Sequence, residues 1–202
     1  MSDPKRRNVA VLVFEEFETL DVFGPVEIFG RLKDHYQVSF YSLPGGLVSN
    51  YHGVSILSQA LETLQEADIF LIPGGHGTRP GVEDEVLLKR IHEISNQCDF
   101  VLTVCTGTAL LARTGLLDNR KATTNKRAFD WVVMQGEKVD WIRKARWVRD
   151  EKFYTSAGVS AGMDMVLGFL ADQHGIEFAR KVAFEIEYDW TENAEEDHFY
   201  LQ

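Results

Sequence analysis

One cysteine stands where a buried strand changes directly into a helix. Residues 100–104 form an apolar run rich in β-branched residues, which predicts a strand buried on both faces. Cys105 follows at once, Gly107 permits a tight turn, and residues 109–112 favour helix. A side chain on such a turn is lifted out of the sheet, and amides at the helix start favour its thiolate. The pattern therefore indicates a reactive thiol, with a small buried core cysteine as the alternative.

Two carboxyls follow the first predicted strand, and a reactive cysteine needs a group that moves protons. Glu18 or Asp21 could hydrogen-bond the thiol, and a desolvated carboxyl can serve as general acid or base. Each carboxyl also has a possible role that is structural and not catalytic. Glu18 could be a solvated turn residue, whereas Asp21 could cap the following helix.

A glycine-rich loop follows the strand predicted at residues 68–73. The backbone amides of Gly74 and Gly75, together with that of Thr106, could form an oxyanion-type site; the alternative is a plain glycine turn. Among the six histidines, only His76 falls in a predicted site loop, where it would contact substrate or stay solvated. No histidine or cysteine spacing fits zinc, so we expect neither a metal nor another cofactor.

The whole chain has the composition of a soluble globular protein. It has 202 residues, 45% hydrophobic and 26% charged, and a formal net charge of -10. That charge argues against nucleic acid as a partner, and the sequence shows neither a membrane-spanning run nor a signal peptide. Its two cysteines, Cys98 and Cys105, fit a reducing cytoplasm better than a disulfide scaffold.

Strand-like and helix-like segments alternate, which predicts an α/β fold with a mostly parallel sheet. We expect one domain over residues 1–202, with a core at 9–186 and an acidic, aromatic tail at 187–202 that lies on a neighbour or is partly disordered. The predicted strands are 9–14, 36–42, 53–57, 68–73, 100–104 and the hairpin 145–149 with 152–156. The predicted helices are 20–32, bent or restarted at Pro25, then 61–66, 84–97, 109–115, 128–134, 163–173 and 176–186, with a turn at 43–46.

The chemistry-bearing residues follow strands that should lie side by side. In parallel sheets the functional site lies beyond the carboxyl ends of the strands. The ends near residues 14, 73 and 104 are therefore expected to bring the two carboxyls, the glycine loop and Cys105 into one crevice.

Several motifs resemble the ThiJ/PfpI superfamily, which is allied to class I glutamine amidotransferases. They are Ile72-Pro73-Gly74-Gly75, Val104-Cys105-Thr106-Gly107, Thr114-Gly115-Leu116-Leu117 and Ala122-Thr123-Thr124. Residues 20–25 and 157–164 resemble the branch that contains isocyanide (isonitrile) hydratases and the sensing domains of some AraC-type regulators. The resemblance implies a flavodoxin-like three-layer sandwich with a nucleophile-elbow cysteine. It also implies a homodimer, which the surplus of apolar residues in the first helix and the helix after Cys105 favours.

The resemblance also implies roles for individual residues. Cys105 takes the place of the nucleophile, and Asp21 that of the acid/base carboxyl of the hydratases. Glu18 stands where redox-sensing and deglycase-like members keep a glutamate beside the cysteine. Thr106 follows the cysteine as in the hydratases, so the Cys-His pair of protease-like members is missing. Asn125 replaces a histidine of related sequences, which removes a possible base. Gly158 and Val159 are assigned to substrate binding.

Three functions remain open from the sequence. The first is a cofactor-independent hydratase that converts a small isonitrile to an N-substituted formamide, with Phe17, Trp131 and Val159 as an apolar pocket wall. The second is a redox or glyoxalase-like protein in which Glu18 supports an oxidised or reacting Cys105. The third is a ligand-sensing module. A small-molecule substrate is the expected partner in the first reading.

Overall fold

An eight-stranded sheet forms the centre of the molecule. The structure, a computed structural model, describes residues 6–200. The strand order is β3-β4-β2-β1-β5-β6-β10-β9, and every pairing is parallel except β3 with β4 and β9 with β10. The strands are β1 (Arg7–Leu12), β2 (Tyr36–Ser42), β3 (Gly46–Ser49), β4 (Ser55–Ala60), β5 (Ile69–Ile72), β6 (Phe100–Val104), β9 (Trp147–Asp150) and β10 (Phe153–Ser156). The predicted mostly parallel sheet is confirmed.

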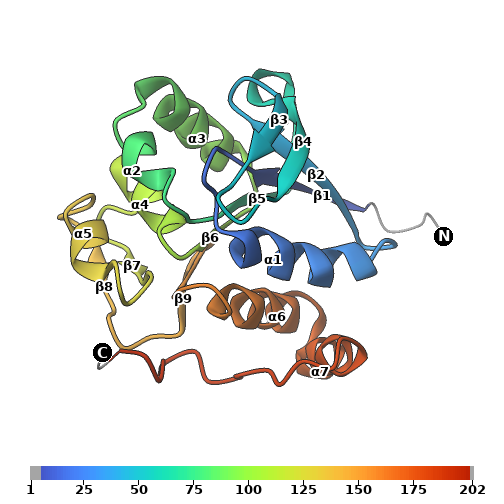
Figure 1. Cartoon of the computed structure of the whole chain (residues 1–202). Helices are drawn as coiled ribbons and strands as arrows, with labels where there is room; N and C mark the ends of the chain where they lie inside the picture. Colours follow the sequence, from blue (N-terminus) through green and yellow to red (C-terminus); the bar gives the residue numbers. More distant parts are fainter. Residues whose placement is uncertain (1–5, 201–202) are drawn as a thin grey trace.

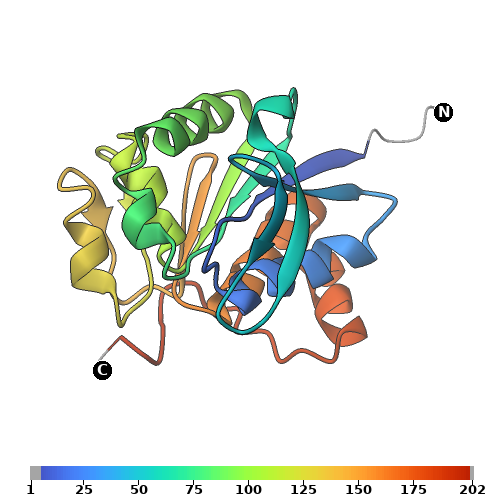
Figure 2. The ribbon, with the colours of Figure 1, turned by 45° about the horizontal axis from the view of Figure 1, so that its top comes forward.

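Helices cover both faces of this sheet and make a three-layer sandwich. The helices are α1 (Thr19–Arg31), α2 (Thr78–Gly81), α3 (Glu85–Gln97), α4 (Gly107–Arg113), α5 (Phe129–Val133), α6 (Ala161–His174) and α7 (Ile176–Glu185). Alternate side chains of β1 enter two cores. Val9 and Val11 belong to the core with α1, α6 and α7, whereas Ala10 and Leu12 belong to the core with α3 and α4. Figures 1 and 2 show these two groups of helices on opposite sides of the strands.

Most elements match the sequence prediction, including the short α5, β9 and β10, and the differences lie in a few short elements. Strand β2 has the predicted bounds, and α1 runs on through Pro25 without a restart. Strand β3 begins at Gly46 inside the predicted turn, and the short helix expected at 61–66 is a 3₁₀ turn, Leu61–Thr63. Helix α2 and a two-stranded sheet were not predicted. That sheet pairs β7 (Lys121–Ala122) with β8 (Asp140–Trp141).

The C-terminal segment, residues 188–200, lies along its own chain. Figure 1 shows it in red, running back from α7 towards α5. Asp164 of α6 is its main anchor: one carboxylate oxygen accepts hydrogen bonds from the Tyr188 hydroxyl (3.1 Å) and the Thr191 amide (3.0 Å). The Trp190 indole donates to the Asp164 carbonyl at 3.1 Å. The described residues of the tail are therefore held by contacts within this chain.

A buried ionic cluster joins that segment to the sheet. Arg146 donates two hydrogen bonds to Asp164, at 2.9 and 2.6 Å, and its third nitrogen lies 3.5 Å from Asp197. Lys126 lies 4.0 Å from the same Asp197 carboxylate and donates to the Ala145 carbonyl at 2.6 Å. Burial lowers the pKa of Lys126 to about 8, although the charge of Asp197 acts in the opposite direction.

Within residues 6–200, the helices are all too short or too polar to cross a bilayer.

Candidate active site

The carboxyl ends of three adjacent strands meet at one place, as the sequence predicts. Strands β1, β5 and β6 are neighbours in the sheet. The loop after β1 is tied to the loop after β5, because the Glu18 amide donates to the Gly74 carbonyl at 2.8 Å and Phe17 forms an isolated bridge with Gly75. Cys105 directly follows β6.

Cys105 occupies a strained turn between β6 and α4. Its φ is +57°, a left-handed conformation that costs energy for a residue other than glycine. Two backbone contacts hold it there. The Cys105 amide donates to the Ala157 carbonyl at 3.2 Å, and the Thr124 hydroxyl donates to the Cys105 carbonyl at 2.7 Å. The side chain is buried, with 6% of the residue exposed.

Burial raises the pKa of the Cys105 thiol well above its ordinary value, and the charge of Asp21 raises it further. The Thr106 amide, the Asn125 side chain and the Val159 amide lie close enough to the sulfur to lower the pKa, by a smaller amount. The amide at the helix start favours the thiolate, as expected, but desolvation has the larger effect, so the balance favours the thiol.

Asp21 is the carboxyl beside this thiol. It is fully buried in the first turn of α1, and its Oδ2 accepts a hydrogen bond from the Gly74 amide at 2.9 Å. Burial raises the Asp21 pKa well above the ordinary value, while the Gly74 amide lowers it and the charge of Glu18 raises it. The Cys105 thiol and the Val159 amide lie close enough to lower it slightly, but among the described residues Oδ1 has no hydrogen bond of good geometry.

Glu18 lies beside His52, at the start of α1. It is the residue before α1, it is partly exposed, and its Oε1 is 3.9 Å from Nδ1 of His52. Its charge raises the Asp21 pKa, and the charge of Asp21 in turn raises the Cys105 pKa. The structure thus separates the two carboxyls that the sequence left equivalent.

Thr106 joins the glycine loop to the cysteine turn. Its hydroxyl accepts a hydrogen bond from the Gly75 amide at 3.1 Å and another from the Thr78 hydroxyl at 3.1 Å. A Cβ on Gly74 would lie 2.7 Å from the Thr106 amide nitrogen and 2.8 Å from Oδ2 of Asp21, so only glycine fits there. The amides of Gly74 and Gly75 are thus bonded to Asp21 and Thr106. They hold the site together and are not open donors.

The turn at residues 157–160 closes the other side of the sulfur. Val159 has a φ of +53°, which is a rare conformation for a β-branched residue, and its amide faces both Cys105 and Asp21. A Cβ on Gly158 would lie 2.1 Å from Nδ2 of Asn125, so glycine permits their contact. Sequence reasoning missed Asn125, which it treated as a lost base. Asn125 directly follows Thr124 in the chain. The Thr124 hydroxyl donates to the Cys105 carbonyl, and this contact places Asn125 near the cysteine.

A cavity of about 220 Å³ adjoins the cysteine turn. It is lined by Asn125, Lys126, Arg127, 158–160, Asp197 and Phe199. Of the expected wall residues, Val159 lines it and Phe17 does not, because Phe17 is fully buried in the core. Trp131 stacks under the guanidinium of Arg79, 3.5 Å from the ring centroid, and Arg79 lies within electrostatic reach of Cys105. His76 is exposed and stacks against Tyr51.

We expect iodoacetamide to label Cys105 before Cys98. Cys98 ends α3 at the opposite end of β6, and burial together with Asp68 and Asp99 raises its pKa to about 12, although Lys152 lowers it. Three polar groups near Cys105 favour its thiolate, and two of them, Asn125 and Val159, line the cavity. Since both thiol pKa values are raised, labelling should accelerate as the pH rises above 8. Peptide mass spectrometry after limited alkylation gives the order, and earlier labelling of Cys98 in the folded protein would contradict the site.

Comparison with known proteins agrees with the fold. The model of the DJ-1/PfpI family matches residues 7–172. The chain is 30% identical to an isonitrile hydratase of Pseudomonas putida, over 89% of this chain and 78% of that protein. The crystal structure of a ThiJ/PfpI family protein from Pseudomonas syringae superposes with a TM-score of 0.83 at 27% identity, covering 92% of this chain and 76% of that one.

A regulator also resembles the chain, over a smaller part of its own length. The transcriptional regulator CdhR of Pseudomonas aeruginosa is 28% identical over 79% of this chain, which spans 47% of the regulator. Drosophila melanogaster DJ-1beta shares the fold, with a TM-score of 0.80 at 17% identity over 92% of this chain and all of that one. The matched model covers most of the described sheet and both sides of the cysteine turn. The chain belongs to the DJ-1/PfpI family.

Proposed function

We propose that this protein is a cofactor-independent isonitrile hydratase in which Cys105 is the nucleophile. The observation that carries the proposal is the pairing of a buried carboxyl, Asp21, with the Cys105 thiol, while Glu18 lies further out beside His52. The 30% identity to an isonitrile hydratase supports the same reaction. A glyoxalase-like or redox role is the alternative, and it would use Glu18, whose Oε1 lies 3.9 Å from Nδ1 of His52.

The first half of the reaction adds the thiol to the isonitrile carbon. Burial raises the pKa of both Asp21 and Cys105 and so favours their protonated forms, which suits Asp21 to donate a proton. The Cys105 sulfur bonds to the terminal carbon, that carbon takes the Asp21 proton, and the thiol proton replaces it on Asp21. The product is a thioimidate with its C=N bond intact. The Thr106 and Val159 amides stabilise the sulfur while it carries negative charge.

The second half hydrates that thioimidate. Water adds to the carbon, one water proton passes through Asp21 to the nitrogen, and the C=N bond becomes a single bond. The C–S bond then breaks as the carbonyl forms, and the sulfur recovers a proton from the hydroxyl group through Asp21. The sum is one isonitrile and one water converted to one N-substituted formamide, with Asp21 and Cys105 restored.

A substrate screen tests this proposal directly. The purified protein is incubated with alkyl and aryl isonitriles and, separately, with methylglyoxal. We expect formation of the N-substituted formamide, and intact-protein mass spectrometry during turnover should find the isonitrile mass added at Cys105. Conversion of methylglyoxal without conversion of any isonitrile would replace the proposal with the glyoxalase-like function. Binding of isonitriles without conversion of either would favour a sensing module.

We further predict a homodimer. In α4 the residues from Gly107 to Ala112 are buried within this chain, so that helix supplies no dimer surface. Helix α1 does expose an apolar side chain, Phe23, which is 37% exposed. Light scattering at micromolar concentration is expected to give twice the chain mass of 23.0 kDa. A mass of one chain across that concentration range would contradict the prediction.

A further inference from the structure

The C-terminal segment, residues 188–200, supplies one wall of the cavity beside Cys105. Asp197 and Phe199 line it, opposite residues 125–127 and the turn at 158–160. Asp197 is 1% exposed, and Phe199 is 52% exposed. A segment that follows Cys105 by more than 80 positions therefore shares a cavity with the cysteine's own neighbours.

Two residues that line this cavity also lie beside Cys105, although Cys105 itself does not line it. Asn125 lines it, and its side chain lies close enough to Cys105 to lower the thiol pKa. Val159 lines it as well, and its amide faces both the sulfur and Asp21. A ligand in this cavity would lie against the residues that hold the thiol, so the cavity is suited to the part of a substrate that does not react.

The position of Phe199 is fixed from within the protein. The Phe199 amide donates to Oδ1 of Asp197 at 3.1 Å, and the Asp197 amide donates to the Lys144 carbonyl at 2.8 Å. The Asp197 carboxylate also faces Arg146 and Lys126 in the buried ionic cluster. Phe199 therefore stands two residues after a buried anchor, and its ring borders the cavity with little freedom of the backbone.

We propose that the C-terminal segment is a wall of the substrate pocket and that Phe199 limits the size of the group on the isonitrile nitrogen. This inference rests on the proposed hydratase function. The cavity of about 220 Å³ is smaller than the roughly 300–1,000 Å³ of pockets for drug-sized ligands. It suits a compact alkyl group or a single ring, and a fused-ring substituent would collide with Phe199.

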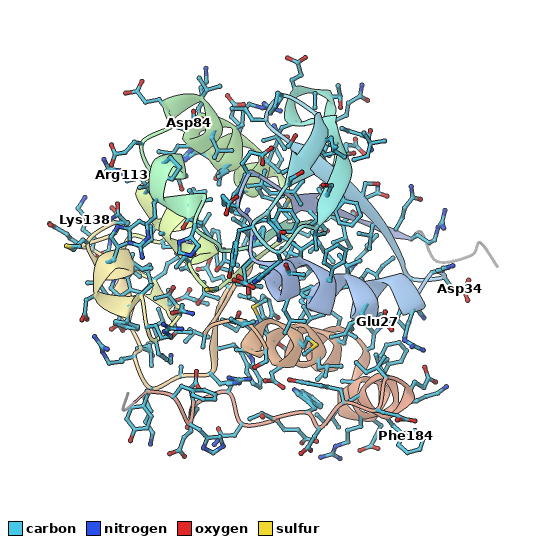
Figure 3. The ribbon with its side chains drawn as sticks, in the orientation of Figure 1. Glu27, Asp34, Asp84, Arg113, Lys138 and Phe184 are labelled. Carbon is cyan, nitrogen blue, oxygen red and sulfur yellow. The ribbon has the colours of Figure 1, made fainter. Side chains whose placement is uncertain are left out.

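Substrate size is tested with three variants and two isonitriles. Phe199→Ala should raise the kcat/KM ratio of 2-naphthyl isocyanide to cyclohexyl isocyanide by about tenfold or more, because removed side-chain volume admits the larger group. Phe199→Trp should lower the ratio. Phe184→Ala is the control. Phe184 is 83% exposed and points outward from α7 (Figure 3), so this variant should keep the wild-type ratio. Equal ratios in all three variants would overturn the proposal.

A second measurement separates the pocket wall from the hydratase function. Alkylation of Cys105 by iodoacetamide and by N-(1-naphthyl)iodoacetamide is followed by mass spectrometry, which needs no turnover. Phe199→Ala should raise the relative rate of the bulky reagent, and Phe184→Ala should not. If Phe199→Ala raises the relative rate of the bulky reagent but the protein converts no isonitrile, Phe199 is still a wall of the pocket and the isonitrile is rejected as the ligand. Unchanged relative rates would reject the wall, whatever the activity.

Discussion

Replacing Asp21 with asparagine should lower isonitrile turnover by about 10²–10⁴-fold, the usual contribution of a positioned acid or base. Asparagine keeps the shape and can still accept the hydrogen bond from the Gly74 amide, but it does not titrate. Wild-type kcat should fall as the pH rises through the Asp21 pKa, which burial raises, because the ionised carboxyl has no proton to donate. Asp21→Asn should lose that pH dependence along with most of the rate.

Glu18→Gln is the matched control, since it removes the other carboxyl of the same region. It should reduce turnover much less, because Glu18 lies beside His52 and acts on Asp21 only through its charge. Thermal melts separate lost chemistry from lost stability. Because burial raises the Asp21 pKa, its ionisation at high pH costs folding free energy, so Asp21→Asn should melt no lower than wild type at pH 8. A larger loss of isonitrile turnover in Glu18→Gln than in Asp21→Asn would contradict the mechanism.

Asp164→Ala should cost about 3–5 kcal/mol of unfolding free energy, as expected when one partner of a buried ion pair is removed. Arg146 would stay buried without its two hydrogen bonds to Asp164, and the Tyr188 hydroxyl and Thr191 amide would lose their acceptor. The C-terminal segment should become more mobile, and the free energy of unfolding of the whole protein should fall. Urea unfolding followed by circular dichroism measures the change in free energy by linear extrapolation.

Glu27→Ala provides the comparison for that measurement. Glu27, labelled in Figure 3, pairs with Arg31 one turn along α1, and both side chains are about half exposed. An exposed i,i+4 pair contributes about 0.3–0.5 kcal/mol, so this variant should be nearly as stable as wild type. If Asp164→Ala were no more destabilising than Glu27→Ala, the buried cluster would not be what anchors the C-terminal segment.

The central sheet could be predicted from the sequence because buried parallel strands are continuous apolar runs. Residues 68–73 and 100–104 are such runs and become β5 and β6. Strands β3, β7 and β8 have two to four residues each and no apolar period. Their pairing depends on tertiary contacts, such as the Lys121 amide bonded to Asp150, and a sequence pattern does not record these contacts.

The candidate site was predictable only in part. Cys105 and the glycine loop are visible as a strand-to-helix joint and a turn motif. Glu18 and Asp21 are three residues apart and so fall on the same side of a helix start, which left their roles unresolved. Only the packing shows that Asp21 is fully buried and Glu18 is not. Phe199 reaches the cavity through the buried anchor at Asp197, a long-range arrangement that no local spacing indicates.

The path of the C-terminal segment also bears on aggregation. An unpaired sheet edge is a template onto which a strand of another molecule can add. At the β9 edge, the Ala194 carbonyl accepts hydrogen bonds from the amides of Arg146 and Trp147, so the segment already occupies the start of that edge. The opposite edge is β3, which has four residues and begins at Gly46, with a φ of +87°. An intruding strand would therefore find one edge partly covered and the other too short to hold it firmly.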